Sequence, residues 1–305
     1  MGTPDFAKVC LQAIVEAGHE IVGVVTQPDK PKGRSYKLTP PPVKVYAEEQ
    51  GLPVYQPVTL KDEAFKDELC ELSPEIIIVA AYGKILPKYI IDYPRYGCIN
   101  AHGSVLPGYR GAAPIQRAII NGESETGITV MYMNEGLDTG DMILVEKTPI
   151  TEEDNFETLH DRLAEIGGRT LVEAMKALEN GSAKREKQDD SLATYAHKIE
   201  KEDCKIDFMR PATELNRRIR GVTPIPGAFC YQGEKMLKIF ATEPTEGKGK
   251  PGEVIAISSK GEGGFTVACA EGALLVKGVI PEGKGRMSAG DYVRGRKINI
   301  GDILK

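Results

Sequence analysis

The sequence predicts an α/β protein, with a Rossmann-like parallel-sheet domain followed by a small OB-like β-barrel domain. In the first part of the chain, short apolar runs alternate with amphipathic helical stretches, as in parallel sheets whose strands are connected by helices. Beyond residue 200, five short strand-like runs separated by Gly and charged turns are typical of a small barrel. A chain of 305 residues is long enough for two hydrophobic cores. We therefore expect a first domain at 1–181, a polar linker at 182–199 and a second domain at 200–305.

The elements expected in the first domain follow one another along the chain. Strands are predicted at 21–26, 76–81, 98–102, 127–133 and 142–148, and helices at 6–17, 42–50, 112–120 and 158–179. The strand at 76–81 has no polar alternation, as expected for a strand buried on both faces. Five prolines and four basic residues between residues 27 and 42 predict a long loop. No G-x-G-x-x-G motif opens the first helix, which argues against a nicotinamide-binding site.

The second domain is expected to carry a net positive charge. A basic helix is predicted at 211–221, followed by strands at 229–231, 236–241, 252–257, 265–268 and 273–279. Through residue 181 the chain has 17 basic and 27 acidic residues, and from residue 182 it has 22 and 17. The two parts therefore carry −10 and +5, which sum to the −5 of the whole chain. A basic second part is consistent with an RNA partner.

Asn100 and His102 are expected on one face of the strand 98–102, because residues two apart on a strand point the same way. Gly103 ends this strand, and ligands of open α/β sheets bind where strands end. A second polar cluster, E-G-L-D-T-G-D, carries Asp138. These residue types suit acyl transfer, in which Asn donates to an oxyanion, His moves a proton and Asp fixes the His tautomer. The spacing alone fits a purely structural histidine as well.

Several other kinds of site are disfavoured. Ser104 lies in H-G-S-V-L and not in the G-x-S-x-G turn that exposes a nucleophilic serine. The six cysteines and four histidines are scattered, without the spacing of zinc sites or disulfide frameworks. The sequence has no signal peptide and no apolar run of about 18 residues. We expect a cytoplasmic monomer without a metal ion and without a membrane segment.

The run N-A-H-G-S-V-L-P-G-Y-R-G-A-A-P-I-Q, followed by G-L-D-T-G-D-M, resembles the methionyl-tRNA formyltransferase family of folate-dependent formyltransferases. The segments G-T-P-D-F, T-Q-P-D-K-P-K-G-R and M-S-A-G-D-Y-V-R-G also match, so the resemblance covers nearly the whole chain. It implies transfer of the formyl group of 10-formyltetrahydrofolate, a cosubstrate, to the α-amino group of methionyl initiator tRNA. The product would be N-formylmethionyl-tRNA for translation initiation, formed by direct attack of the amine without a covalent enzyme intermediate.

The resemblance also implies roles for individual residues. Asn100 would hold the oxyanion, His102 would move the proton, and Asp138 would orient His102. The folate-binding residues would be Ile85, Leu86, Ser104, Val105, Leu106 and Pro107. The loop 27–42 would meet the acceptor end of the tRNA, with Arg34 matching the key arginine of the family. The other expected tRNA contacts are Lys32 and Lys37 in that loop and Arg217, Arg218 and Arg220 on the basic helix.

The chain departs from the family pattern in three places. Family members have a short apolar strand before Gly2. Its absence indicates either a shortened start or a truncated sequence, and it predicts that the neighbouring strands lack a partner. Ser35 and Tyr36 depart from the usual G-R-G-K-K-L, and Ile225 stands where members often have Trp, which removes one stacking group.

Two other functions remain open at this point. A folate-dependent formyltransferase acting on a sugar-nucleotide amine would share Asn100, His102 and Asp138, but the basic loop and the basic second part favour tRNA. A non-catalytic RNA-binding protein with a relic α/β domain is the other alternative. The intact set of Asn, His and Asp argues against it.

Overall fold

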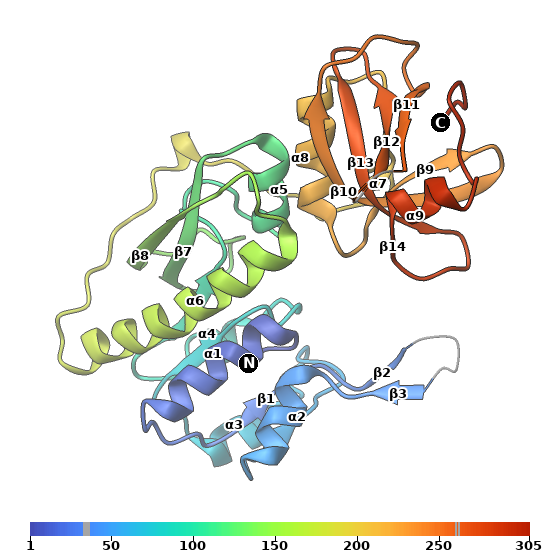
Figure 1. Cartoon of the computed structure of the whole chain (residues 1–305). Helices are drawn as coiled ribbons and strands as arrows, with labels where there is room; N and C mark the ends of the chain where they lie inside the picture. Colours follow the sequence, from blue (N-terminus) through green and yellow to red (C-terminus); the bar gives the residue numbers. More distant parts are fainter. Residues whose placement is uncertain (33–36, 260, 262) are drawn as a thin grey trace. The chain divides into compact units, whose positions relative to one another are not determined.

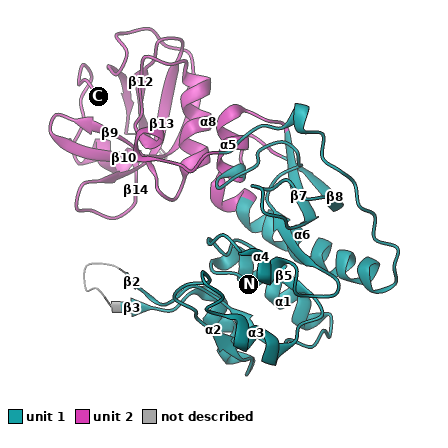
Figure 2. Cartoon of the chain, turned by 180° about the vertical axis from the view of Figure 1, so that it is seen from behind, with its two compact units in different colours: residues 1–114, 125–149, 160–196 teal, residues 115–124, 150–159, 197–305 magenta. Residues whose placement is uncertain are grey.

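The computed structural model in Figure 1 describes residues 1–32, 37–259, 261 and 263–305. The chain forms two compact units, coloured separately in Figure 2. Unit 1 consists of residues 1–114, 125–149 and 160–196, and unit 2 of residues 115–124, 150–159 and 197–305. Most of the segment expected as a linker, up to Ala196, therefore belongs to unit 1.

Unit 1 combines helices with eight strands in the part of the chain that the structure describes. Its helices are α1 (Asp5–Glu16), α2 (Pro42–Glu49), α3 (Lys66–Leu72), α4 (Lys88–Ile91), most of α6 (Phe156–Glu179) and the 3-10 turn η1 (Asp190–Leu192). Its strands are β1 (Val24–Val25), β2 (Lys30–Lys32), β3 (Lys37–Thr39), β4 (Val54–Tyr55), β5 (Ile77–Val79), β6 (Cys98–His102), β7 (Glu125–Tyr132) and β8 (Met142–Pro149).

The sheets of unit 1 confirm the α/β class. Strand β1 pairs with β4 and β5 pairs with β6, both in parallel. Strands β7 and β8 extend the second sheet in the order β5-β6-β7-β8, but they run antiparallel to their neighbours. The connection between β7 and β8, residues 133–141, is too short for the crossover that a parallel pair needs.

The region predicted as a long loop at 27–42 contains a hairpin instead, so this prediction was wrong. Strands β2 and β3 pair antiparallel, with Lys30 opposite Thr39. Prolines at several positions hide this pairing from a sequence pattern, because proline is normally depleted in strands. The expected strand 21–26 is likewise reduced to the two residues of β1.

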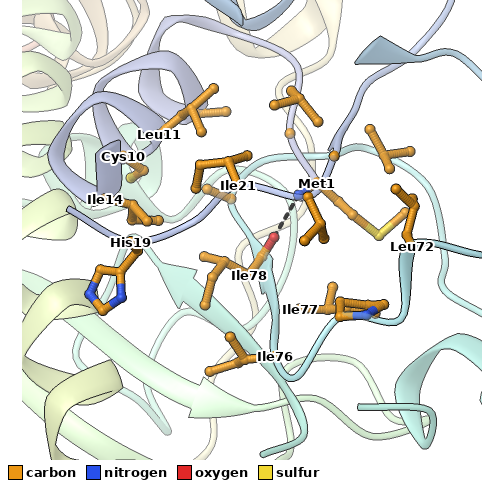
Figure 3. A pocket seen from close by; sticks show the side chains of 18 of the residues that line it. Met1, Cys10, Leu11, Ile14, His19, Ile21, Leu72, Ile76, Ile77 and Ile78 are labelled. Atoms are coloured by element: carbon orange, nitrogen blue, oxygen red, sulfur yellow. Dashed lines mark hydrogen bonds between the residues drawn. The ribbon is translucent and has the colours of Figure 1, made fainter. Parts of the chain in front are cut away.

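Met1 and Gly2 lie between strands β1 and β5. The Gly2 N–H donates to the Val25 carbonyl (3.0 Å), and the Ala80 N–H donates to the Met1 carbonyl (3.0 Å). The Met1 ammonium donates to Ile78 O at 2.6 Å, and its burial lowers the pKa of this amine to about 6. A mostly apolar cavity of about 140 Å³ surrounds it (Figure 3). None of the residues that line this cavity is Asn100, His102 or Asp138.

Unit 2 contains one curled antiparallel sheet with helices packed against it. Its helices are α5 (Pro114–Asn121, from Ile115 on), α7 (Lys201–Cys204), α8 (Ala212–Val222) and α9 (Ala289–Arg294). Its strands are β9 (Ala228–Gln232), β10 (Lys235–Thr245), β11 (Val254–Ser258), β12 (Gly264–Ala268), β13 (Ala273–Pro281) and β14 (Met287–Ser288). The buried residues of α8 and of β9 to β13 form one hydrophobic core.

The strand order β11-β12-β13-β10-β9 confirms the small β domain predicted as OB-like, and the sheet is open in the described residues. The edge strands are separated by the last residues of the chain, where Leu304 bridges to Gln232 and Ile303 bridges to Glu253. Closure by strand-to-strand pairing is prevented because this terminal segment occupies the backbone groups of both edges.

A half-buried ion pair links α5 to α7 inside unit 2. The Arg117 guanidinium donates to both carboxylate oxygens of Asp203, at 2.9 and 2.7 Å. These bonds hold the pKa of Asp203 below its ordinary value. A lowered carboxyl pKa stabilises the fold above the ordinary pKa of about 4, and this contribution is lost as the pH falls through the folded value.

We therefore expect Asp203→Asn to lower the free energy of unfolding by about 1–3 kcal/mol at pH 7. The deficit should shrink as the pH falls below the ordinary carboxyl pKa of about 4, because the charge-dependent stability of the wild type is lost as its carboxyl becomes protonated. Urea unfolding followed by circular dichroism at pH 7 and pH 3 measures it. An equal deficit at pH 7 and pH 3 would show that the charge of Asp203 does not stabilise unit 2.

Candidate active site

Strand β6 places Asn100 and His102 next to each other on one face of the sheet. Its register is fixed on both sides, with Asn100 opposite Val79 of β5 and His102 opposite Thr129 of β7. His102 is buried, with 6% of its surface exposed, and Asn100 is half-buried. Within the described part of the chain, the Asn100 amide has no hydrogen-bond partner, so its N–H groups are free to bind a ligand.

The His102 ring lies between two oxygen atoms. Its Nε2 is 2.9 Å from the carbonyl oxygen of Tyr109, and its Nδ1 is 3.6 Å from Asp138 Oδ2. A carbonyl oxygen only accepts, so Nε2 carries a proton and donates it. An imidazolium here donates from Nε2 to the Tyr109 carbonyl, and the Asp138 carboxylate, 3.6 Å from Nδ1, balances its charge. The ring is therefore placed to hold and release a proton.

Asp138 reaches His102 from a loop that runs back along the sheet. The loop 133–141 leaves β7 beside Cys98, since the Met133 N–H donates to the Cys98 carbonyl at 2.8 Å. Cys98 is four residues before His102, about 13 Å along a strand. Asp138 has a left-handed backbone (φ 52°), and its Oδ2 accepts from the Gly111 N–H at 2.8 Å. The loop conformation thus determines whether the carboxylate meets the ring.

The segment Ser104–Pro107 follows β6 and is fixed to β7. Thr129 Oγ1 donates to the Ser104 carbonyl (2.7 Å) and accepts from the Leu106 N–H (3.0 Å). The side chain of Leu106 is buried with Met131 and Met142. Val105 and Pro107 are half-buried, so they retain surface for a ligand beside His102.

Ile85 and Leu86, predicted together as folate contacts, have opposite environments. Leu86 is 4% exposed and belongs to the core of unit 1, whereas Ile85 is 93% exposed. Of the two, only Ile85 presents its side chain to solvent.

Two residues that the sequence analysis missed, Arg110 and Gln188, adjoin the loop of Asp138. Arg110 is 2% exposed, and its guanidinium donates to Gln188 Oε1 at 3.0 and 2.8 Å. The Gln188 amide donates to the carbonyls of Asp138 and Gly140, both at 2.8 Å. Arg110 lies within the motif that carried the resemblance, but nothing in the polar sequence around Gln188 distinguishes it.

Comparisons with known proteins identify the family. Residues 1–175 match the family described as "Formyl transferase", and residues 198–297 match "Formyl transferase, C-terminal domain". The chain belongs to the formyl transferase family. It is 47% identical over 304 residues to the methionyl-tRNA formyltransferase of Citrifermentans bemidjiense, covering 100% of this chain and 95% of that protein. It is 49% identical over 298 residues to the methionyl-tRNA formyltransferase of Marinobacter nauticus, covering 97% of this chain and 95% of that protein. The resemblance inferred from the motifs is confirmed.

Solved structures of lower sequence identity share the fold. A sugar 3N-formyl transferase, solved with dTDP and 5-N-formyl-THF, has a TM-score of 0.65 at 20% identity, covering 93% of this chain and 97% of that one. HypX from Aquifex aeolicus, solved in complex with tetrahydrofolic acid, has a TM-score of 0.62 at 20% identity. The match covers 85% of this chain and 46% of HypX. At this identity the likeness concerns the fold alone.

The tRNA contacts expected from the formyl transferase family fall in two regions. Arg34 lies outside the described residues. The backbones of Lys32 and Lys37 pair with each other in the β2–β3 hairpin. On α8, Arg218 is 23% exposed and its Nε is 3.3 Å from Glu214. These four residues remain predictions as tRNA contacts.

Arg220, also expected to contact tRNA, is engaged inside unit 2. Its guanidinium donates to the carbonyls of Thr151 (3.0 Å) and Asp154 (2.6 Å), and the side chain is 13% exposed. Arg217 lies over Gly122, and its Nε is buried without a hydrogen-bond partner in the described residues. The geometry therefore favours a bracing role for Arg220.

No helix among residues 1–32, 37–259, 261 and 263–305 combines the length and apolarity needed to cross a bilayer. No group of three or more His, Cys, Asp or Glu side chains in these residues could hold a metal ion.

Proposed function

We propose that this chain transfers the formyl group of 10-formyltetrahydrofolate to the α-amino group of methionyl initiator tRNA. The placement of the Asn100 amide, His102 and Asp138 around one strand end carries the proposal. The full-length similarity to methionyl-tRNA formyltransferases, at 43–49% identity, supports the choice of substrate. All three side chains come from one chain, which is consistent with a monomer. A tRNA substrate is consistent with a cytoplasmic protein.

The reaction needs no protein nucleophile. The substrate amine attacks the formyl carbon, and the Asn100 N–H groups bind the oxyanion of the tetrahedral intermediate. The C–N bond to the folate nitrogen then breaks, and this nitrogen takes up the proton that the attacking amine loses. For His102 to carry that proton, one ring nitrogen has to leave its present neighbour, either Nε2 the Tyr109 carbonyl or Nδ1 the Asp138 carboxylate. While His102 holds the proton, the Asp138 carboxylate stabilises the imidazolium.

The folate donor is proposed to bind beside the segment Ser104–Pro107. Val105 and Pro107 retain exposed surface there, and the hydrogen bonds of Thr129 hold the backbone of this segment in place. Ser104 Oγ and the Leu106 side chain are already used, since Oγ donates to the Gly108 carbonyl (2.6 Å) and Leu106 is buried. These two are proposed to shape the segment, and Ile85 to supply an apolar contact.

A formylation assay with three possible acceptors tests the function. Purified protein and the folate donor are incubated with methionylated initiator tRNA, uncharged tRNA or an amino-sugar nucleotide. Formyl incorporation only into the methionylated tRNA is expected. Transfer to the amino sugar alone would favour the sugar-nucleotide alternative, and tRNA binding without folate binding would favour a non-catalytic RNA-binding protein.

Two sets of residues are proposed to contact tRNA: Arg34, which lies outside the described residues, and Arg217 and Arg218 on α8 of unit 2. A recess of about 460 Å³ in unit 2 contains Arg218 together with Lys205, Arg210 and Lys305, against Glu202 and Asp207. Basic side chains that touch phosphates release bound counterions, which makes tRNA affinity depend on salt.

Replacing both Arg217 and Arg218 by Gln is expected to weaken tRNA binding and to flatten its salt dependence. The slope of log affinity against log salt should fall by about one unit for each lost phosphate contact. Titration of wild type and variant at several salt concentrations measures the slopes, with the double variant Lys61→Gln/Lys176→Gln, at two exposed positions of unit 1, as the charge-matched control. Parallel lines would place the RNA surface elsewhere in unit 2.

A further inference from the structure

We propose that the segment Glu186–Ala196, here called the strap, positions the catalytic histidine, and that Gln188 is its principal positioning residue. The strap lies within the sequence expected to be only a linker. It contacts both loops that supply the oxygen acceptors of His102. The proposal rests on the proposed function, because it assigns the strap to the same site.

Gln188 holds the loop of Asp138 by its backbone. Its two amide N–H groups donate to the carbonyls of Asp138 and Gly140, each at 2.8 Å. The strap also pairs with the end of this loop, where Met142 and Glu186 exchange backbone hydrogen bonds of 2.8 and 3.0 Å. Because the loop has to run back along β6 to reach His102, these contacts determine where the Asp138 carboxylate stands.

Arg110 fixes the orientation of the Gln188 amide. An amide group can flip, which would exchange its oxygen and its N–H groups. The buried guanidinium of Arg110 only donates, so Oε1 must face it and the N–H groups must face the loop carbonyls. Burying the Arg110 charge is costly unless it is hydrogen-bonded, and Gln188 and Asp190 provide those bonds. The charge of Arg110 therefore locks Gln188 in the one orientation that supports the loop.

The strap holds the second acceptor of His102 as well. Thr194 Oγ1 accepts from the Tyr109 N–H at 2.9 Å, and the Thr194 carbonyl accepts from the Arg110 N–H at 2.9 Å. Ala196 continues the pairing by donating to the Arg110 carbonyl at 2.7 Å. Only glycine fits at Gly111, where φ is +121° and an added Cβ would lie 2.8 Å from the Ala196 carbonyl oxygen. Both sides of the imidazole are thus held through one segment.

Gln188→Glu tests the proposal with the smallest change. The carboxylate keeps the acceptor for Arg110 but loses both N–H donors to the loop, and it repels the two carbonyls. We expect kcat for formylation to fall about 10- to 100-fold, the range for a catalytic group displaced by about 1 Å, with the KM values for both substrates nearly unchanged. Gln12→Glu, the same exchange on α1, is the matched control and should retain wild-type kcat.

Two more measurements separate positioning from general damage. In an Asp138→Asn background, Gln188→Glu should add little further loss, because both act on the same carboxylate. Hydrogen exchange of the Gly111 amide, which donates to Asp138, should accelerate in Gln188→Glu without any substrate present. Thr194→Val removes the acceptor of the Tyr109 N–H and tests the strap at a second position. If Gln188→Glu does not fold, a lowered kcat of Thr194→Val supports the proposal and a wild-type kcat contradicts it.

A Gln188→Glu variant with wild-type kcat and wild-type Gly111 exchange would overturn the proposal. An equal loss of kcat from Gln188→Glu in the wild-type and the Asp138→Asn backgrounds would overturn it too. A wild-type protein that does not formylate methionyl-tRNA would contradict the proposed function instead, and the exchange measurement would still test the strap.

Discussion

Replacing Asp138 by Asn is expected to lower kcat by up to about 10⁴-fold, the loss seen when the carboxylate that orients a catalytic histidine becomes an amide. The amide has nearly the same shape, but it carries no charge to balance an imidazolium, and its N–H₂ can face Nδ1 of His102. The Nδ1–Oδ2 separation of 3.6 Å is the observation behind this expectation. Steady-state kinetics with methionyl-tRNA and the folate donor measure the effect.

Asp141 provides the matched control for that experiment. It lies in the same G-L-D-T-G-D run but is not one of the residues around His102. Asp141→Asn should therefore keep kcat close to that of wild type, and both variants should melt near the wild-type temperature. Near-normal turnover in a folded Asp138→Asn protein would remove Asp138 from the mechanism.

Asn100→Ala is expected to lower kcat by about 10²- to 10³-fold, the usual cost of losing one oxyanion donor. The oxyanion exists only in the transition state and intermediate, so the KM values should change little. A folded variant with normal kcat and a raised KM for the folate donor would show that Asn100 binds the substrate in its ground state and does not stabilise the oxyanion.

Helices and strands with a clear hydrophobic period could be predicted from the sequence. The amphipathic stretch 158–179 corresponds to α6, and the apolar run 127–133 corresponds to β7. The β2–β3 hairpin was missed because its prolines argue against strands. The open sheet of unit 2 could not be foreseen, since it depends on where Ile303 and Leu304 bind.

The candidate site was only partly predictable from the sequence, because local patterns do not show contacts between residues far apart along the chain. Asn100 and His102 are two residues apart on one strand, so a local pattern places them together. Asp138 was linked to them by the chemistry of its residue type and by the family motif, because no local rule reveals that its loop folds back to His102. Gln188 is 50 residues from Asp138 and 78 from Arg110 along the chain, so its polar neighbours give no indication of these bonds.

The strap has a consequence for the order in which the protein matures. Contacts between residues far apart in sequence carry a large loop-closure cost and tend to form after local ones. During synthesis, strands β5 to β8 are complete by Pro149, yet Gln188 and Thr194 follow some forty residues later. A nascent chain can thus contain the whole sheet, with Asn100 and His102 in register, before Asp138 is held. We expect activity to arise as one of the last events of folding in unit 1.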